Sequence, residues 1–264
     1  MATVSMSASE SMPLVQSTTL SNTGAAKGGK GTPSTSGTAV RIVAVGLIAA
    51  AVLPYLIALM LGHVPIILPM ISDCQVLHPE AYVSKPLMLS FGFAGLAYVA
   101  TLQYQTFALA SETLASITTC IGALNKANLL LAYICSFATG IAGAVNEKAN
   151  NEVHSAAALL AFMGWCTWMW LSSFLFGMLF ASCGEESGVH EEARKRGRKL
   201  LTRKLFTAAF MTASLSIGVG FLQAGYMSDA RGHTAIATAE WASYFSIAAF
   251  AWTVAIQVDL FDGR

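Results

Sequence analysis

Long apolar runs recur along the chain between residues 40 and 258, and short polar segments separate them. Each run is close to the ~20 residues that an α-helix needs to cross about 30 Å of hydrocarbon. The runs are rich in Ala, Leu, Met and Gly and do not alternate in ~10-residue segments, as the strands of a membrane barrel do. They cover residues 40–61, 87–109, 127–145, 155–181, 205–227 and 235–258. The pattern predicts an all-α, polytopic membrane protein with a six-transmembrane-helix bundle.

The first 38 residues have a different composition. Fifteen of them are Ser or Thr, Gly is frequent, and only Glu10, Lys27 and Lys30 are charged. Such a segment buries too little apolar surface to offset the entropy lost on ordering. We therefore expect a disordered Ser/Thr/Gly-rich tail at 1–38 and a six-helix membrane domain at 39–264. The Ser richness leaves a plastid-type transit peptide open as an alternative.

The overall composition agrees with a bilayer environment. The chain has 264 residues, of which 55% are hydrophobic and 11% are charged, whereas a soluble domain carries about 25% charged residues. A formal net charge of +1 gives no sign of nucleic-acid binding. The sequence contains no phosphate-binding loop, GxGxxG, HExxH or nucleophile elbow. We expect no catalytic residue, no cofactor and no nucleic-acid partner.

The distribution of basic residues predicts the orientation. If the N-terminus is cytoplasmic, 12 Lys and Arg residues lie on the cytoplasmic side and 3 on the other side. Because basic residues accumulate in short cytoplasmic loops, both termini are predicted to be cytoplasmic. This orientation fits an integral membrane protein.

The fourth loop carries most of this bias. Its basic residues are Arg194, Lys195, Arg196, Arg198, Lys199, Arg203 and Lys204. Beside a membrane, such residues attract anionic lipid with about 1 kcal/mol each. The alternative is that they only set the topology and form a solvated face. Cys183, at the end of the fourth apolar run, is a palmitoylation candidate, with an unmodified buried thiol as the alternative. Membrane lipids are the expected partners, together with proteins that contact this loop and the tail.

The first loop on the other side of the membrane, residues 62–80, is dense in Pro, His and acidic residues beside apolar ones. Pro65, Pro69 and Pro79 interrupt regular helix. The stretch from Ile66 to Ile71 is too apolar for a free loop. We expect the segment to fold back onto the bundle or into the membrane interface.

This loop resembles the hallmark loop of the damage-regulated autophagy modulator (DRAM) family, which reads H-V-x-P-x-x-P-Y-I-S-D-T-G-x-x-P-P-E. That family is related to the FGF-receptor-activating protein group and to the N-terminal part of a yeast cell-wall biogenesis protein. The matching positions are His63, Pro69, Ile71, Ser72, Asp73, Pro79 and Glu80, and the departures are Met70, Cys74, Gln75 and His78. Two further stretches, at 146–162 and 239–261, resemble the family as well.

The resemblance implies six helices and a non-enzymatic regulator of autophagy or lysosome-linked processes. Relatives in the wider family imply an alternative, a lipid-handling protein in GPI-anchor remodelling or in plasma-membrane phosphoinositide and lipid-asymmetry control. A transporter is a weak third hypothesis, because no pair of interrupted helices suggests inverted repeats.

Ionisable and polar residues gather on the side opposite the termini. The candidate cluster consists of His63, Ser72, Asp73, Glu80, His154 and Glu240. Acids near the apolar zone are costly unless paired, and we predict His154 as the partner of Glu240. One interpretation is a pocket for a lipid headgroup, and another is a proton- or zinc-dependent site. The third is that these groups cap helix ends and tie the loop to the bundle.

Overall fold

The computed structural model describes residues 33–112, 118–186, 191–226 and 229–262. Within these ranges every regular element is a helix, which confirms the all-α prediction. The elements are α1 (Thr35–Met60), η1 (Asp73–Gln75), α2 (Glu80–Leu87), η2 (Met88–Gly95), α3 (Leu96–Glu112), α4 (Thr118–Ala144), α5 (Asn151–Glu186), α6 (Glu191–Gln223) and α7 (Ala230–Asp262).

Six segments in these ranges are long and apolar enough to cross a membrane, as predicted. They are Thr35–Met60, Glu80–Ser111, Cys120–Ala144, Asn151–Ala181, Arg194–Gln223 and Arg231–Asp262. α6 begins at Glu191, ahead of the apolar run at 205–227. Arg, Lys, Glu and Leu are good helix formers, so the basic segment extends the helix. Gly225, with φ 77°, ends it before residue 227.

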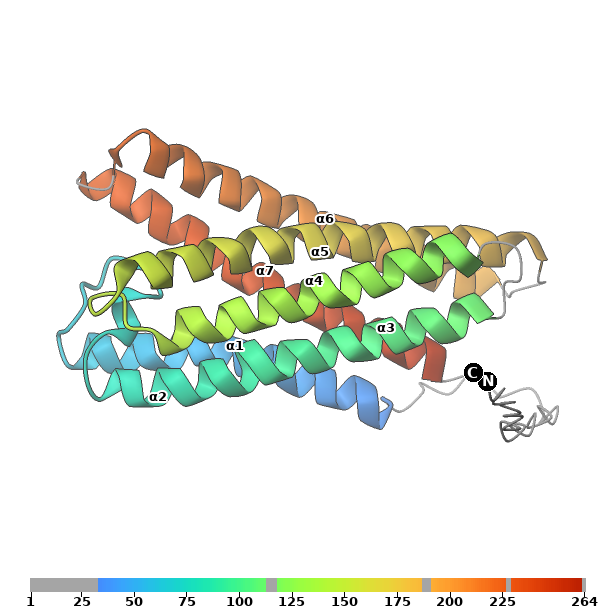
Figure 1. Cartoon of the computed structure of the whole chain (residues 1–264), viewed down its shortest axis with the longest axis horizontal. Coiled ribbons are helices and arrows are strands. Elements are labelled where there is room, and N and C mark those ends of the chain that lie inside the picture. Colours follow the sequence, from blue (N-terminus) through green and yellow to red (C-terminus); the bar gives the residue numbers. More distant parts are fainter. Residues whose placement is uncertain (1–32, 113–117, 187–190, 227–228, 263–264) are drawn as a thin grey trace, which may run out of the picture. The chain divides into compact units, whose positions relative to one another are not determined.

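Successive long helices run in opposite directions, and α1 begins at the same end at which α7 finishes (Figure 1). We call this the terminal end and the opposite one, which holds residues 61–79, the loop end. At the loop end, α6 and the first part of α7 lean away from the other helices. The exposed face of α6 is consequently large, and only 17% of its most apolar window is buried.

α7 occupies the centre of the bundle and contacts α1, α3, α5 and α6. Its buried face continues an aromatic row from α5. Trp165 meets Trp168 edge-on at 5.2 Å, and Trp168 meets Phe250 at 5.3 Å. The Trp165 indole donates to Thr139 Oγ1 on α4 at 3.0 Å, so its one polar atom is satisfied inside the core.

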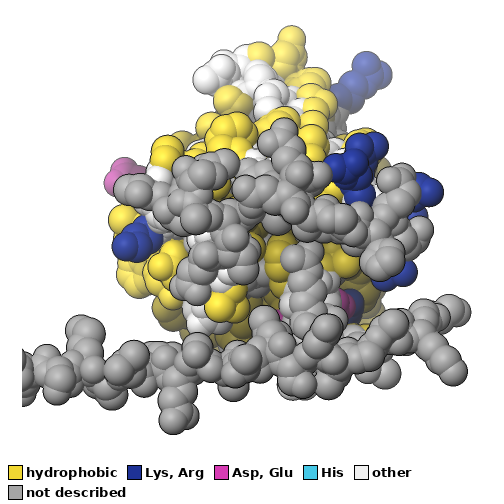
Figure 2. All heavy atoms as spheres, turned by 90° about the vertical axis from the view of Figure 1, so that its right-hand side faces the viewer, with side chains coloured by type: hydrophobic (Ala, Val, Ile, Leu, Met, Phe, Trp, Pro, Cys, Tyr) yellow, Lys and Arg dark blue, Asp and Glu magenta, His cyan; other side chains and the backbone are white. Residues whose placement is uncertain are grey.

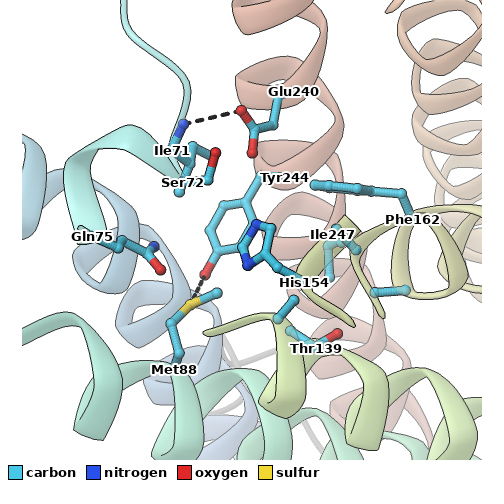
Figure 3. Close-up of a pocket in the computed structure, with 13 residues that line it drawn as sticks. Ile71, Ser72, Gln75, Met88, Thr139, His154, Phe162, Glu240, Tyr244 and Ile247 are labelled. Carbon is cyan, nitrogen blue, oxygen red and sulfur yellow. Dashed lines mark hydrogen bonds between the residues drawn. The ribbon is translucent and has the colours of Figure 1, made fainter. Parts of the chain in front are cut away.

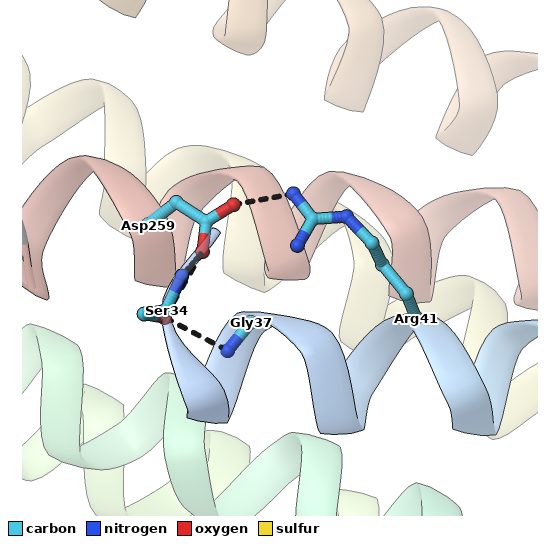
Figure 4. A network of polar contacts seen from close by, with 4 residues as sticks. All are labelled: Ser34, Gly37, Arg41 and Asp259. Atoms are coloured by element: carbon cyan, nitrogen blue, oxygen red, sulfur yellow. Dashed lines mark hydrogen bonds and ion pairs between the residues drawn. The ribbon is translucent and has the colours of Figure 1, made fainter. Parts of the chain in front are cut away.

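A polar network joins the first turns of α1 to the last turns of α7 (Figure 4). Ser34 Oγ accepts from the backbone N–H of Gly37 and so caps α1. Asp259 accepts from the backbone and the hydroxyl of Ser34, each at 3.0 Å, and pairs with Arg41. The cap explains why α1 starts at Thr35, inside the segment 1–38 that we expected to be disordered. The rest of that tail, residues 1–32, lies outside the described residues.

The second span changes helix type where it approaches α1 and α4. Pro86 lacks a backbone N–H, and the chain continues after α2 as the π-helix η2 before α3 begins. A Cβ on Gly95 would lie 2.8 Å from the Val43 side chain, and one on Gly92 would lie 3.0 Å from Thr139. Glycine at these positions lets the π-helix pack closely against both neighbours.

Candidate functional site

The loop between α1 and α2 is held against the start of α7. The indole of Trp241 donates to the carbonyl of Pro69 at 2.8 Å. The backbone N–H of Ile71 donates to Glu240 Oε2 at 3.0 Å. Tyr55 of α1 packs edge-on against Trp241 with ring centroids 5.7 Å apart. The expectation that this apolar segment folds back onto the bundle is confirmed for residues 69–71, whereas 82% of Ile66 and 71% of Ile67 remain exposed.

The loop is also closed by its own hydrogen bonds. Asp73 Oδ2 accepts from the backbone N–H of Met70 at 3.1 Å, and the Cys74 thiol donates to the Met70 carbonyl at 3.3 Å. Cys74 is fully buried. Burial raises the pKa of this thiol to about 12, and the nearby carboxyl groups of Asp73 and Glu240 contribute in the same direction. Cys74 therefore remains a neutral thiol at physiological pH.

A small cavity lies beneath this loop, between η2, α4, α5 and α7 (Figure 3). Its volume is about 50 Å³, room for a few water molecules or one small polar group. The cavity is open on one side. Most of its lining is apolar, and its polar lining residues are Ser72, Gln75, Thr139, His154, Glu240 and Tyr244.

Glu240 and His154 line the same cavity but do not pair with each other. His154 Nδ1 lies 3.1 Å from the Val145 carbonyl and closes the turn between α4 and α5. Glu240, which is half-buried, holds the loop through Ile71. The predicted Glu240–His154 pair is therefore wrong, because Glu240 accepts from the backbone of the loop and His154 lies against the backbone of the α4–α5 turn.

The rest of the predicted cluster forms two separate groups. His63 Nδ1 lies 2.9 Å from Glu80 Oε1. Glu80 is fully buried, and its other carboxylate oxygen has no hydrogen-bond partner among the described residues. Asp73 approaches His233 Nε2 at 3.9 Å. The six candidates thus divide into a cavity group (Ser72, His154 and Glu240), a pair of exposed His63 with buried Glu80, and Asp73 within the loop.

Several cavity residues were not among the six candidates predicted from the sequence. The Tyr244 hydroxyl donates to the sulfur of Met88 at 3.3 Å across the cavity floor. Tyr244 follows Glu240 by one helical turn, a spacing that predicts a shared face. Thr139, Gln75 and Phe162 come from other elements, and no sequence spacing relates them to Glu240.

Metal binding finds no support in the described ranges. No three His, Cys, Asp or Glu side chains there converge on a common point. Among these residues, His63 pairs with Glu80, and Glu240 and His154 lie against backbone groups. The arrangement of the described residues therefore does not support the zinc interpretation.

The basic segment is not one uniform surface. Lys195, Arg196, Arg198, Lys199 and Arg203 are exposed, whereas Arg194 is half-buried. Lys204 is fully buried, and its ammonium lies over the rings of Phe250 at 4.5 Å and Phe176 at 5.8 Å. Its assignment to a lipid-facing cluster is wrong, because position 204 lies on the inward face of α6. The Cys183 side chain lies outside the described residues.

The fold and this site define a multipass integral membrane protein with a loop folded over one end of a six-helix bundle. The chain belongs to the Frag1/DRAM/Sfk1/Cwh43P N-terminal domain family, whose sequence profile matches residues 36–261. It is 31% identical over 115 residues to DNA damage-regulated autophagy modulator protein 1 of Homo sapiens. That alignment spans 44% of this chain and 47% of the human protein, which is less than half of each. No solved structure matches the chain.

Proposed function

We propose that the protein is a non-enzymatic membrane regulator of an autophagy- or lysosome-linked process. The observation that supports this role most directly is the similarity to the human protein whose name describes an autophagy modulator. In this proposal the loop end is the site of action, because it combines the family's loop with a cavity in the membrane domain.

The proposal includes an orientation with both termini in the cytoplasm. It rests on the excess of Lys and Arg at the terminal end. An epitope inserted at 187–190 should be reached by antibody only after the membrane is permeabilised. Staining of intact cells would reverse the orientation.

A second proposed function is lipid handling through the cavity. Glu240 places a carboxyl group inside a membrane-spanning helix, where ionisable groups are costly and are usually functional. The cavity opens to one side and holds an imidazole, a hydroxyl and a carboxyl group in mainly apolar walls. An amine or hydroxyl of a lipid headgroup fits this space, whereas a complete headgroup exceeds about 50 Å³.

Both functions are tested in cells that lack the protein and express wild type, Glu240→Gln or His154→Ala. Autophagic flux is measured with and without a lysosomal inhibitor, beside protein abundance, location and total lipid composition. Glu152→Gln, an exposed acid at the same end, is the matched control. We expect both cavity variants to lose the effect on flux at normal abundance, while the control retains it.

The outcomes separate the proposals. Unchanged flux in cells lacking the protein, together with altered lipid composition, would reject autophagy regulation and support lipid handling. Loss of flux regulation without a lipid change supports the first function. An equal loss of protein abundance in Glu240→Gln would assign the carboxyl group a structural role only.

A further inference from the structure

The outward face of α6 carries a stripe that is basic at the terminal end and aromatic further into the span. Lys195, Lys199 and Arg203 are exposed at four-residue spacing. Phe206 and Phe210 follow, with 71% and 48% of their surfaces exposed. Because an α-helix has 3.6 residues per turn, these five residues share one face.

The opposite face of α6 makes the contacts with the bundle. Gly197, Leu200, Lys204 and Ala208 are buried there. A Cβ on Gly197 would lie 2.1 Å from the Phe180 ring, so the backbone of α6 is pressed against α5 at this level. The Lys195 face therefore points away from the rest of the bundle.

The basic part of the stripe has no acidic partner among the described side chains. No ion pair joins Lys195, Lys199 or Arg203 to a carboxylate in those ranges. Asp259, a carboxylate at the same end, forms an ion pair with Arg41. Figure 2 shows basic side chains gathered on one side of this end, next to hydrophobic surface.

We propose that this stripe binds an anionic phospholipid. Lys195, Lys199 and Arg203 hold the phosphate and the acidic headgroup, and the acyl chains lie along Phe206 and Phe210. The two phenyl rings are stacked 6.4 Å apart and form one apolar strip. From Arg203 to Phe210 the helix rises about 10 Å, which is the passage from the headgroup region into the hydrocarbon.

The order of residues favours a lipid over another polyanion. A nucleic acid or an acidic peptide contacts the three cations equally well but leaves the exposed phenyl rings without a partner. A phospholipid satisfies both parts, because its charge and its chains are arranged in the same order as the stripe. This site lies at the terminal end, so it does not depend on the function of the loop-end cavity.

The test uses the full-length protein in detergent and native mass spectrometry with phosphatidylserine and phosphatidylcholine of identical acyl chains. We expect wild type to bind phosphatidylserine at least about tenfold more tightly. The triple variant Lys195→Gln/Lys199→Gln/Arg203→Gln should bind the two lipids equally. The control triple variant Lys85→Gln/Lys148→Gln/Arg231→Gln removes as many charges at the loop end and should keep the preference.

A second variant separates the two halves of the stripe. Phe206→Ala/Phe210→Ala should weaken binding of both lipids by a similar factor and keep the preference for phosphatidylserine. The proposal is overturned if the first triple variant keeps the preference, or if the control variant loses it to the same extent. The second result would assign the preference to total charge.

Discussion

The carboxylate of Glu240 accepts a hydrogen bond from the backbone N–H of Ile71, which joins α7 to a loop 169 positions earlier in the chain. The next residue, Trp241, binds the carbonyl of Pro69 in the same loop. Two neighbouring side chains of one helix therefore fix the loop over the cavity. This arrangement explains how an apolar loop with three prolines is held against the bundle.

The Trp241 hydrogen bond predicts a measurable loss of loop order. Trp241→Phe keeps the aromatic packing but removes the donor to Pro69, so the free energy of unfolding should fall by about 0.5–1.5 kcal/mol. Limited proteolysis within residues 62–79 should become faster. Trp252→Phe, at an exposed position on the same helix, is the control for ring size. Equal proteolysis of both variants would show that the indole hydrogen bond does not hold the loop.

The burial of Lys204 predicts that an apolar residue of similar length at this position stabilises the protein. Its ammonium is buried, lacks a hydrogen-bond partner among the described residues and is met only by two phenyl rings. Lys204→Met keeps the length of the side chain and removes the cost of burying charge. The apparent Tm in detergent should rise by about 2–4 °C for each kcal/mol gained.

Arg198→Met is the matched control for Lys204→Met, because it removes an exposed charge from the same helix. It should leave the Tm nearly unchanged. A lower Tm in Lys204→Met would mean that the ammonium makes a favourable interaction that the two phenyl rings do not account for.

Close helix packing predicts opposite effects for two glycines. A Cβ on Gly143 would lie 2.4 Å from the Cβ of Met88, so Gly143→Ala forces α4 away from η2. Such overpacking costs about 1–3 kcal/mol. Nothing lies within 4 Å of a Cβ on Gly220, so Gly220→Ala should be neutral or stabilise by up to ~1 kcal/mol. Thermal unfolding of the two variants tests this prediction. Similar unfolding midpoints would contradict the close packing of Gly143 against Met88.

The Cys74 thiol predicts an unusual dependence of alkylation on pH. An ordinary thiol, with a pKa of about 8.5, ionises increasingly between pH 7 and 9 and reacts faster as the thiolate. Because the pKa of Cys74 is raised to about 12, it stays protonated over this range. Its alkylation in the folded protein should therefore be slow throughout and still rise about tenfold per pH unit up to pH 9, whereas the rate of an ordinary thiol levels off near its pKa. Peptide mass spectrometry after maleimide labelling measures this, with exposed Cys120 as the comparison; equal rates at both sites would contradict the burial.

The six spans were predictable because a bilayer requires long apolar helices with internally paired backbones. The start of α1 was not, because it depends on Ser34, whose cap is held in turn by Asp259 from the far end of the chain. Lys204 could have been placed correctly. It shares four-residue spacing with Leu200 and Ala208, and that periodicity predicts an inward face.

The sequence also predicted that the six polar candidates lie at the loop end, but not how they pair. His63 and Glu80 form a side-chain pair, whereas Glu240 and His154 bind backbone groups. These partners depend on distances that tertiary packing sets. Such distances cannot be read from residue types and spacing. Tyr244 is the exception, because its position one turn after Glu240 places it on the cavity face.

The central claim is that the loop-end cavity is the functional site, and filling it tests the claim most directly. Ala158 lines the cavity, and Ala158→Leu replaces a methyl group by an isobutyl group while leaving every polar residue in place. Ala156→Leu, at an exposed position two residues earlier on α5 that does not line this cavity, is the control. Autophagic flux is measured for both in cells lacking the protein. The account predicts that Ala158→Leu abolishes the effect at normal abundance and location while Ala156→Leu retains it; full activity of Ala158→Leu would contradict it.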